Sequence, residues 1–203
     1  LSSDGKRLAI GAPGNDGNGN GAGHVRVYLE SGGVWSQLGS DINGEAAFNQ
    51  SGISVSLSSD GKRLAIGAPS TDAGHVRVYM ESGGAWSQLG SAIYGEYAFE
   101  HSGQSVSLSA DGKRLAIGSP YNYGSIEYNL SGHVRVYSES GSIWSQLGYD
   151  IDGEGSYDES GTSVSLSADG TRLAIGAPEN GTDYFIGIIG SGHVRVYNYS
   201  EPP

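Results

Sequence analysis

The chain of 203 residues contains a repeated sequence, and this repetition constrains its fold more than any other feature. The segment SSDGKRLAIGAP returns with few changes, beginning at Ser2, Ser58, Ser109 and Ser167. A period of about 50 residues is typical of propeller blades or of a solenoid. We therefore treat the chain as a single domain, 1–203, whose repeats are approximately 1–49, 50–100, 101–158 and 159–203.

Three further blocks recur between these copies. GHVRVY begins at Gly23, Gly74, Gly132 and Gly192, WSQLG at Trp35, Trp86 and Trp144, and SGxSVS at Ser51, Ser102 and Ser160. Each block is short, rich in β-branched or aromatic residues and bounded by Gly, Pro, Ser or Asp, which predicts a strand. The 35 glycines fit an all-β chain with frequent tight turns.

The order of the blocks predicts one meandering sheet for each repeat. SGxSVSLS is the innermost strand (A), RLAIGAP the second (B), GHVRVY the third (C) and WSQLGxxI the outermost (D). A Ser-x-Asp-Gly turn joins A to B, and its glycine supplies the positive φ that a tight hairpin needs. The prediction is an all-β fold, a β-propeller of four-stranded antiparallel blades. Four repeats are visible, either as a small closed ring or as part of a larger ring or assembly.

The segment from Ser51 to Pro69 resembles the FG-GAP repeat of the integrin α-subunit head, with its Gly-x-Ser-Val start and Gly-Ala-Pro finish. The resemblance extends over nearly the whole chain and implies an integrin-like extracellular propeller. Serine replaces the usual phenylalanine before the first glycine. The family's calcium loop is shortened to one aspartate in each A–B turn, at Asp4, Asp60, Asp111 and Asp169. One carboxylate cannot supply the six to eight oxygens that calcium takes, so no metal and no other cofactor is predicted.

A formal net charge of −11 excludes nucleic acid as a partner and disfavours anionic membranes. No apolar run is long enough to span a bilayer, so no membrane insertion is expected. The loops between strands B and C and between D and A contain no Lys or Arg. They hold the acids Asp16, Asp41, Glu45, Asp72, Glu96, Glu100, Glu127, Asp150, Asp152, Glu154, Asp158, Glu159, Glu179 and Asp183. We expect both sets of loops on one strongly negative face, which either attracts cationic partners or only keeps the protein soluble.

Aromatic residues in these loops fall into two groups. Phe48, Phe99 and Tyr157 occupy the same place in successive repeats, which favours packing between blades. Others lie in B–C loops that differ between repeats. Together with neighbouring acids they form the candidate ligand-binding set, which is Tyr121, Tyr123, Tyr128, Tyr184, Phe185, Asp183 and Glu127. Aromatic faces beside carboxylates suit sugars or a partner protein.

Three other patterns have a simpler structural interpretation. The oxygen-rich loop 14–23 has a single carboxylate and is better explained as a turn than as a calcium site. The apolar segment 185–190 suggests an added hairpin or a partner contact. Histidines recur one per repeat, at His24, His75, His133 and His193. This distribution favours structural hydrogen bonds over a catalytic or zinc site.

Four Asn-x-Ser/Thr sequences, at Asn49, Asn129, Asn180 and Asn198, are candidate glycosylation sites and favour an extracellular protein, secreted or at the cell surface. No catalytic constellation stands out, so we expect no enzyme. The first hypothesis is a non-catalytic module for adhesion or extracellular assembly that uses the acidic, aromatic loop face. The alternatives are a carbohydrate-binding, lectin-like propeller and, third, a polysaccharide-active enzyme.

The two ends of the repeat array predict association. The first repeat holds little of strand A and the fourth repeat has no WSQLG block, so both leave unpaired main-chain groups at a blade edge. Open edges recruit partners. We expect the segment to join further repeats or neighbouring copies, so that a protein partner or self-association is predicted and a glycan partner stays open.

Overall fold

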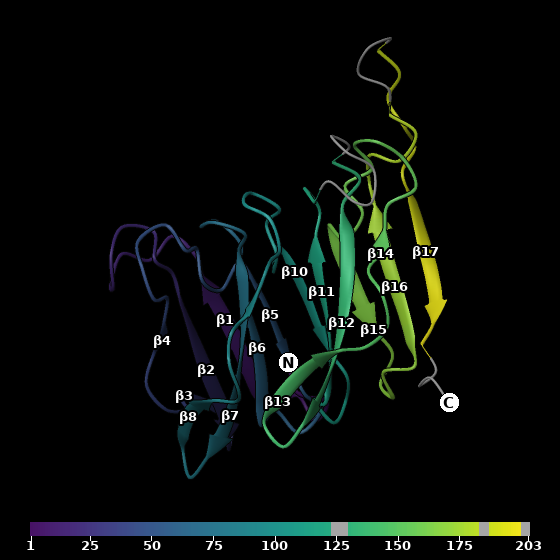
Figure 1. Ribbon diagram of the computed structural model, residues 1–203. Helices are drawn as coiled ribbons and strands as arrows, with labels where there is room; N and C mark the ends of the chain where they lie inside the picture. Colours follow the sequence, from purple (N-terminus) through teal and green to yellow (C-terminus); the bar gives the residue numbers. More distant parts are fainter. Residues whose placement is uncertain (123–129, 183–186, 200–203) are drawn as a thin grey trace.

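The computed structural model describes residues 1–122, 130–182 and 187–199, and every regular element in these ranges is a β-strand (Figure 1). The strands form four separate antiparallel sheets, one for each repeat. Among the described residues there is accordingly no helix that could cross a membrane. The predicted all-β class is confirmed.

Each sheet follows the chain from its inner to its outer edge. The first sheet contains β1 (Arg7–Ala12), β2 (His24–Ser31), β3 (Val34–Gln37) and β4 (Ile42–Asn43). The second contains β5 (Ser54–Leu57), β6 (Arg63–Ala68), β7 (His75–Ser82), β8 (Ala85–Gln88) and β9 (Ile93–Tyr94). The third contains β10 (Ser105–Leu108), β11 (Arg114–Ser119), β12 (His133–Ser140), β13 (Ile143–Gln146) and β14 (Ile151–Asp152). The fourth contains β15 (Ser163–Leu166), β16 (Arg172–Ala177) and β17 (His193–Asn198).

The outer strand differs from the prediction because it is broken into two. In the second sheet, β8 pairs with the end of β7 at Tyr79–Ser82, whereas β9 pairs with its beginning at His75–Val76. Between them Gly90 has a φ of 78°, a left-handed conformation that interrupts the extended chain. The WSQLGxxI block therefore makes two short strands on the same partner.

The four sheets stand side by side in a row, with the first and the fourth at opposite ends (Figure 1). Their innermost strands β5, β10 and β15 are neighbours along the row. The row is an open arc whose two end sheets lie apart (Figure 1), so the alternative of a closed ring of four blades does not fit it. In the described chain the first sheet has no strand on the inner side of β1 and the fourth has none outside β17.

Successive sheets pack through the same apolar contact at each junction. Val76 and Val78 of one sheet are fully covered by Leu115 and Ile117 of the next, and all four side chains are at most 1% exposed. Trp144 packs against the edge of this cluster. Burying each such side chain contributes about 1.5–3 kcal/mol, so these junctions supply most of the apolar stabilisation.

One glycine in strand B allows the sheets to approach closely. A Cβ added to Gly118 would overlap with the carbonyl oxygen of Gly161 in the next sheet, and Gly67 has the same relation to Gly103. The glycine of the LAIG block is therefore required by the neighbouring sheet and not by a turn.

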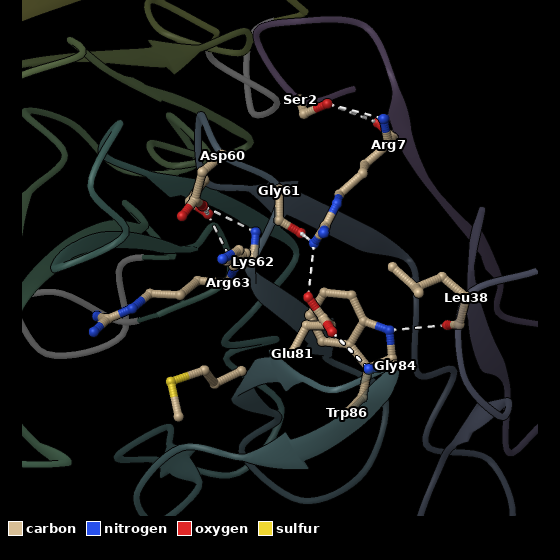
Figure 2. A network of polar contacts seen from close by, with 12 residues as sticks. Ser2, Arg7, Leu38, Asp60, Gly61, Lys62, Arg63, Glu81, Gly84 and Trp86 are labelled. Carbon is tan, nitrogen blue, oxygen red and sulfur yellow. Dashed lines mark hydrogen bonds and ion pairs between the residues drawn. The ribbon is translucent and has the colours of Figure 1, made fainter. Parts of the chain in front are cut away.

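Polar side chains form hydrogen bonds and ion pairs between neighbouring sheets at the edges of the junctions. Figure 2 shows Arg7, whose Nη1 donates to the carbonyl oxygen of Gly61 at 3.1 Å and to Glu81 Oε2 at 3.0 Å. In the opposite direction, Trp86 Nε1 donates to the carbonyl oxygen of Leu38 at 3.1 Å (Figure 2). Arg63 repeats the first contact at the next junction, with Gly112 and Glu139. These arginine–glutamate pairs are largely buried, so the loss of one partner would leave the other charge buried and unpaired.

Candidate binding face

The B–C loops and the D–A loops meet at one end of the sheets, as predicted. The B–C loops are 13–23, 69–74, 120–132 and 178–192, and the D–A loops are 44–53, 95–104 and 153–162. Bridges join Gly23 to Ser51 and Gly74 to Ser102, so each B–C loop lies against the D–A loop that follows it in the chain. We call this surface the loop face.

One side chain in each D–A loop is structural, although two of these residues were counted among the surface acids. Asn49, Glu100 and Asp158 hold the same repeat position and are 5%, 1% and 2% exposed. Glu100 accepts hydrogen bonds from the main-chain amides of Glu96 and Tyr97. It also accepts one from Asn122 Nδ2, at 2.7 Å, in the B–C loop of the next sheet. These residues fix the loops to each other and are not available to a ligand.

A second carboxylate in each D–A loop faces an arginine of the following sheet. The shortest distances are 3.3 Å for Glu45–Arg77, 3.5 Å for Glu96–Arg135 and 3.3 Å for Glu154–Arg195. Arg77 and Arg135 also donate to main-chain carbonyl oxygens at 3.0 Å. These pairs correct the prediction of a strongly negative face, because cationic groups of strand C neutralise part of the acid.

The first sheet uses a different acid. Arg26 donates to both carboxylate oxygens of Asp41 at 2.9 and 2.8 Å, within its own sheet. The hydrogen bond from Arg26, supported by one from Gln37, lowers the pKa of Asp41 to about 2. Asp41 therefore keeps its charge at any physiological pH and is already paired.

The recurring histidines lie at the same end of strand C, and three of them, His24, His75 and His133, are buried. His75 and His133 are 4% and 1% exposed, and burial lowers the pKa of each. Their Nε2 atoms, and that of His193, have no hydrogen-bond partner among the described residues. The expectation of structural hydrogen bonds does not hold for these atoms: the Glu45 carboxylate, for example, lies 3.7 Å from His75 Nε2, too far for a hydrogen bond.

One junction gathers three groups with metal-ligating atoms. Glu96, His133 and Asp150 offer such atoms within 4.8 Å of one another. Arg135 Nη1 lies 3.5 Å from Glu96 Oε1 and places a positive charge beside the same carboxylate, which disfavours a divalent cation there. The cluster fits an ion-pair network better than a metal site.

The aromatic residues of the D–A loops correct a second prediction. Phe48 and Phe99 were expected to pack between blades, yet they are 60% and 77% exposed. Their φ angles are 65° and 67°, a conformation that turns the loop and leaves the ring outside the junction. Tyr157 has the same φ of 66° and is half-buried. Tyr94 and Tyr97, which the sequence did not single out, are also exposed.

A cleft of about 430 Å³ opens on the loop face between the first and second sheets. Its lining includes Glu45, Asp72, His75 and Tyr94. Tyr94 lies against the His75 ring, with centroids 5.5 Å apart. Glu45 keeps 48% of its side chain exposed in spite of its arginine partner. The cleft therefore combines accessible carboxylates with an aromatic ring.

Of the predicted ligand-binding set, the structure describes only Tyr121. Its ring meets His101 edge-on at 4.8 Å, and the charge of Glu159 raises the pKa of its hydroxyl. The other members lie outside the described residues: Tyr123, Glu127, Tyr128, Asp183, Tyr184 and Phe185.

The candidate glycosylation sites differ in accessibility. Asn49 is 5% exposed and its Nδ2 donates to Thr71 Oγ1, which argues against modification in the folded chain. The Nδ2 atom of Asn180 donates to Asp158 at 2.8 Å. Asn198 is exposed at the end of β17, and Asn129 lies outside the described residues.

No known family model matches the chain, and no curated protein matches it in sequence. The resemblance to FG-GAP repeats therefore stays a prediction. Similar solved structures exist at low identity. TolB from Acinetobacter baumannii is 15% identical with a TM-score of 0.56, over 98% of this chain and 40% of that one. A protein assigned as a 6-phosphogluconolactonase from Bacteroides fragilis is 15% identical with a TM-score of 0.58, over 100% and 54%.

Hydrazine synthase from Kuenenia stuttgartiensis is 16% identical with a TM-score of 0.54, over 100% of this chain and 49% of that one. The chain thus spans about half of the length of the structures it matches, or less. These proteins differ in function, so the likeness concerns the fold alone. Together with the four meandering antiparallel sheets, it shows that the chain is an all-β β-propeller protein built from repeated blades.

Proposed function

We propose that this propeller is a non-catalytic binding and structural module of an extracellular protein, and that the loop face is its contact surface. The observation that carries the proposal is the combination of accessible carboxylates and exposed aromatic rings on that face. Glu45, Asp72 and Tyr94 meet at the cleft between the first two sheets, while Phe48 and Phe99 stand exposed on the D–A loops.

The chemistry of the cleft favours a basic segment of a partner protein. A lysine or arginine of the partner finds a carboxylate in Glu45 and Asp72 and an aromatic face in Tyr94. Cation–π contact and charge pairing reinforce each other over such a surface. The B–C and D–A loops contain no lysine or arginine, and Glu45, although it pairs with Arg77 of strand C at 3.3 Å, keeps 48% of its side chain exposed.

A carbohydrate ligand is the second candidate, and the same residues support it. The ring of Tyr94 offers a face for stacking against sugar C–H groups, and Glu45 and Asp72 offer acceptors for hydroxyls. The two candidates differ in their response to salt, because charge pairing with a basic peptide is screened while stacking on a neutral sugar is not.

The test is binding of the full chain to arrays of basic peptides and of glycans, at low and at high salt. We expect salt-sensitive binding of basic peptides that Tyr94→Ala weakens roughly tenfold, the usual scale for an aromatic anchor. Tyr149→Ala is the matched control, because Tyr149 is 92% exposed but lies on the outer edge of the third sheet between β13 and β14.

Three results would contradict the proposal. Salt-insensitive binding of a neutral glycan would favour the lectin-like function. Release of reducing ends from a polysaccharide would establish an enzyme. Peptide binding that Tyr94→Ala leaves unchanged would move the contact away from the loop face.

A further inference from the structure

The two outermost sheet faces of the arc differ from every internal face in their exposure. On the fourth sheet, Val194 and Val196 are 68% and 67% exposed, whereas Val134 and Val136 at the same positions of the third sheet are 0% exposed. We call the outward face of the fourth sheet, with Ser163, Arg172, Val194 and Val196, the C-terminal end face.

The first sheet shows the opposite half of the same contact. Ile10 is 46% exposed, although its counterparts Ile66 and Ile117 are 1% and 0% exposed. Trp35 is 44% exposed on the same side. We call the outward face of the first sheet, with Gly5, Ile10, Glu30 and Trp35, the N-terminal end face.

These two faces are complementary because the internal junctions join the same two halves. Within the chain, the valines of strand C in one sheet pack against the leucine and isoleucine of strand B in the next sheet. The C-terminal end face offers the valines, and the N-terminal end face offers Leu8 and Ile10.

The charged groups are complementary as well. Arg7 and Arg63 each pair with a glutamate of the following sheet, Glu81 and Glu139, at 3.0 Å. Arg172 occupies the same position in the fourth sheet, where it is exposed and has no ion pair with any described residue. Glu30 occupies the glutamate position in the first sheet, and within the described chain it accepts only the main-chain amide of Gly33.

The glycine of strand B that lets neighbouring sheets approach closely also indicates an unoccupied contact surface on the fourth sheet. Gly67 and Gly118 each face a carbonyl oxygen of the next sheet, whereas the atoms nearest to Gly176 all belong to Ser163 in its own sheet. The fourth repeat thus keeps a glycine that its neighbours need for contact with a following blade.

We propose that the C-terminal end face of one copy docks on the N-terminal end face of a second copy and repeats the contact that successive sheets make inside the chain. Arg172 of one copy then pairs with Glu30 of the other, and Val194 and Val196 cover Ile10. Two such contacts join two copies into one ring of eight sheets, within the usual range of about four to eight blades. This inference does not depend on the loop face or its ligand.

The test is the particle mass of the full 203-residue chain over a range of concentrations, by analytical ultracentrifugation and native mass spectrometry. We expect twice the 21.0 kDa of one chain. The variants Arg172→Glu and Glu30→Arg should each weaken the association roughly tenfold or more, because like charges then face each other at the contact. The double variant, Arg172→Glu with Glu30→Arg, should restore it.

The controls separate docking from folding. Lys113→Glu makes the same change of charge on an exposed A–B turn away from both end faces, and it should leave the mass unchanged. Circular dichroism should show a native β spectrum for every variant. A chain that stays monomeric at all concentrations, two single reversals without effect, or a double variant that stays dissociated would each overturn the proposal.

Discussion

The hydroxyl of Tyr199 donates a hydrogen bond to the carbonyl oxygen of Leu147 at 2.7 Å. At the other two junctions a tryptophan donates to the equivalent carbonyl oxygen. Trp86 Nε1 donates to Leu38 and Trp144 Nε1 donates to Leu89, both at 3.1 Å. The fourth repeat has no WSQLG block. At the last junction Tyr199, at the end of strand C, therefore makes the hydrogen bond that tryptophan makes at the other two.

We predict that Tyr199→Phe lowers the free energy of unfolding by about 1 kcal/mol, the usual net value of one hydrogen bond. The ring stays in place and only the donor is lost, so denaturant titration should show a shifted midpoint with an unchanged slope. Tyr149→Phe is the control, because that side chain is 92% exposed. Equal effects of the two substitutions would mean that the Tyr199 hydroxyl does not fasten the junction.

A second prediction concerns the close approach at strand B. Gly118→Ala should destabilise the chain by about 1–3 kcal/mol, as overpacking does, because a Cβ would meet the carbonyl oxygen of Gly161. Gly176→Ala is the matched control, since it has the same serine hydroxyl beside it but no carbonyl oxygen of a following sheet. Thermal unfolding should therefore give a lower melting temperature for Gly118→Ala than for Gly176→Ala. If Gly176→Ala lowered the stability as much as Gly118→Ala does, the contact with the serine hydroxyl would account for the effect and the carbonyl oxygen would not.

The repeat and its strand order could be predicted from the sequence, because each strand is marked by local composition and bounded by turn residues. The break in the outer strand was missed for a physical reason. The left-handed φ of Gly90 in the WSQLG block ends one short strand before the next begins on the same partner. A glycine inside a strand motif is the only sequence signal for this break, and a bulge gives the same signal.

The sequence predicted where the loop face lies, but not that arginines of strand C pair with its carboxylates. The pairs Glu45–Arg77 and Glu96–Arg135 join different repeats, so they depend on how neighbouring sheets are aligned, and the spacing within one repeat does not encode that. Phe48 and Phe99 were assigned to packing because they recur. The positive φ recurs at this turn position, yet the rings of Phe48 and Phe99 are exposed there and that of Tyr157 is half-buried, so recurrence alone does not mark a core position.

A third prediction concerns pH. Burial lowers the pKa of His75 and of His133 below the usual value of about 6.5, so the folded chain binds fewer protons at these sites than the unfolded chain does. Stability is then fully present above pH 6.5 and falls as the pH drops below it. The melting temperature should decline between about pH 6.5 and 5.5, and His133→Asn should make this decline shallower relative to its own value at pH 8. An unchanged slope in His133→Asn would exclude this ring as a source of the acid sensitivity.

The last prediction is that folding needs no metal ion, because the A–B turns use their single carboxylate internally. Asp60 Oδ1 accepts hydrogen bonds from Ser58 Oγ at 2.7 Å and from the amide of Lys62 at 2.9 Å. In the fourth repeat, hydrogen bonds from Ser167 and Thr171 lower the pKa of Asp169 to about 2. The carboxylate thus closes the turn that a calcium ion would otherwise organise. Chelation with EDTA should leave the melting temperature unchanged, and added calcium should not raise it. A drop with EDTA that calcium or zinc reverses would contradict this, and loss of that response in Asp150→Asn would locate the ion at Glu96, His133 and Asp150.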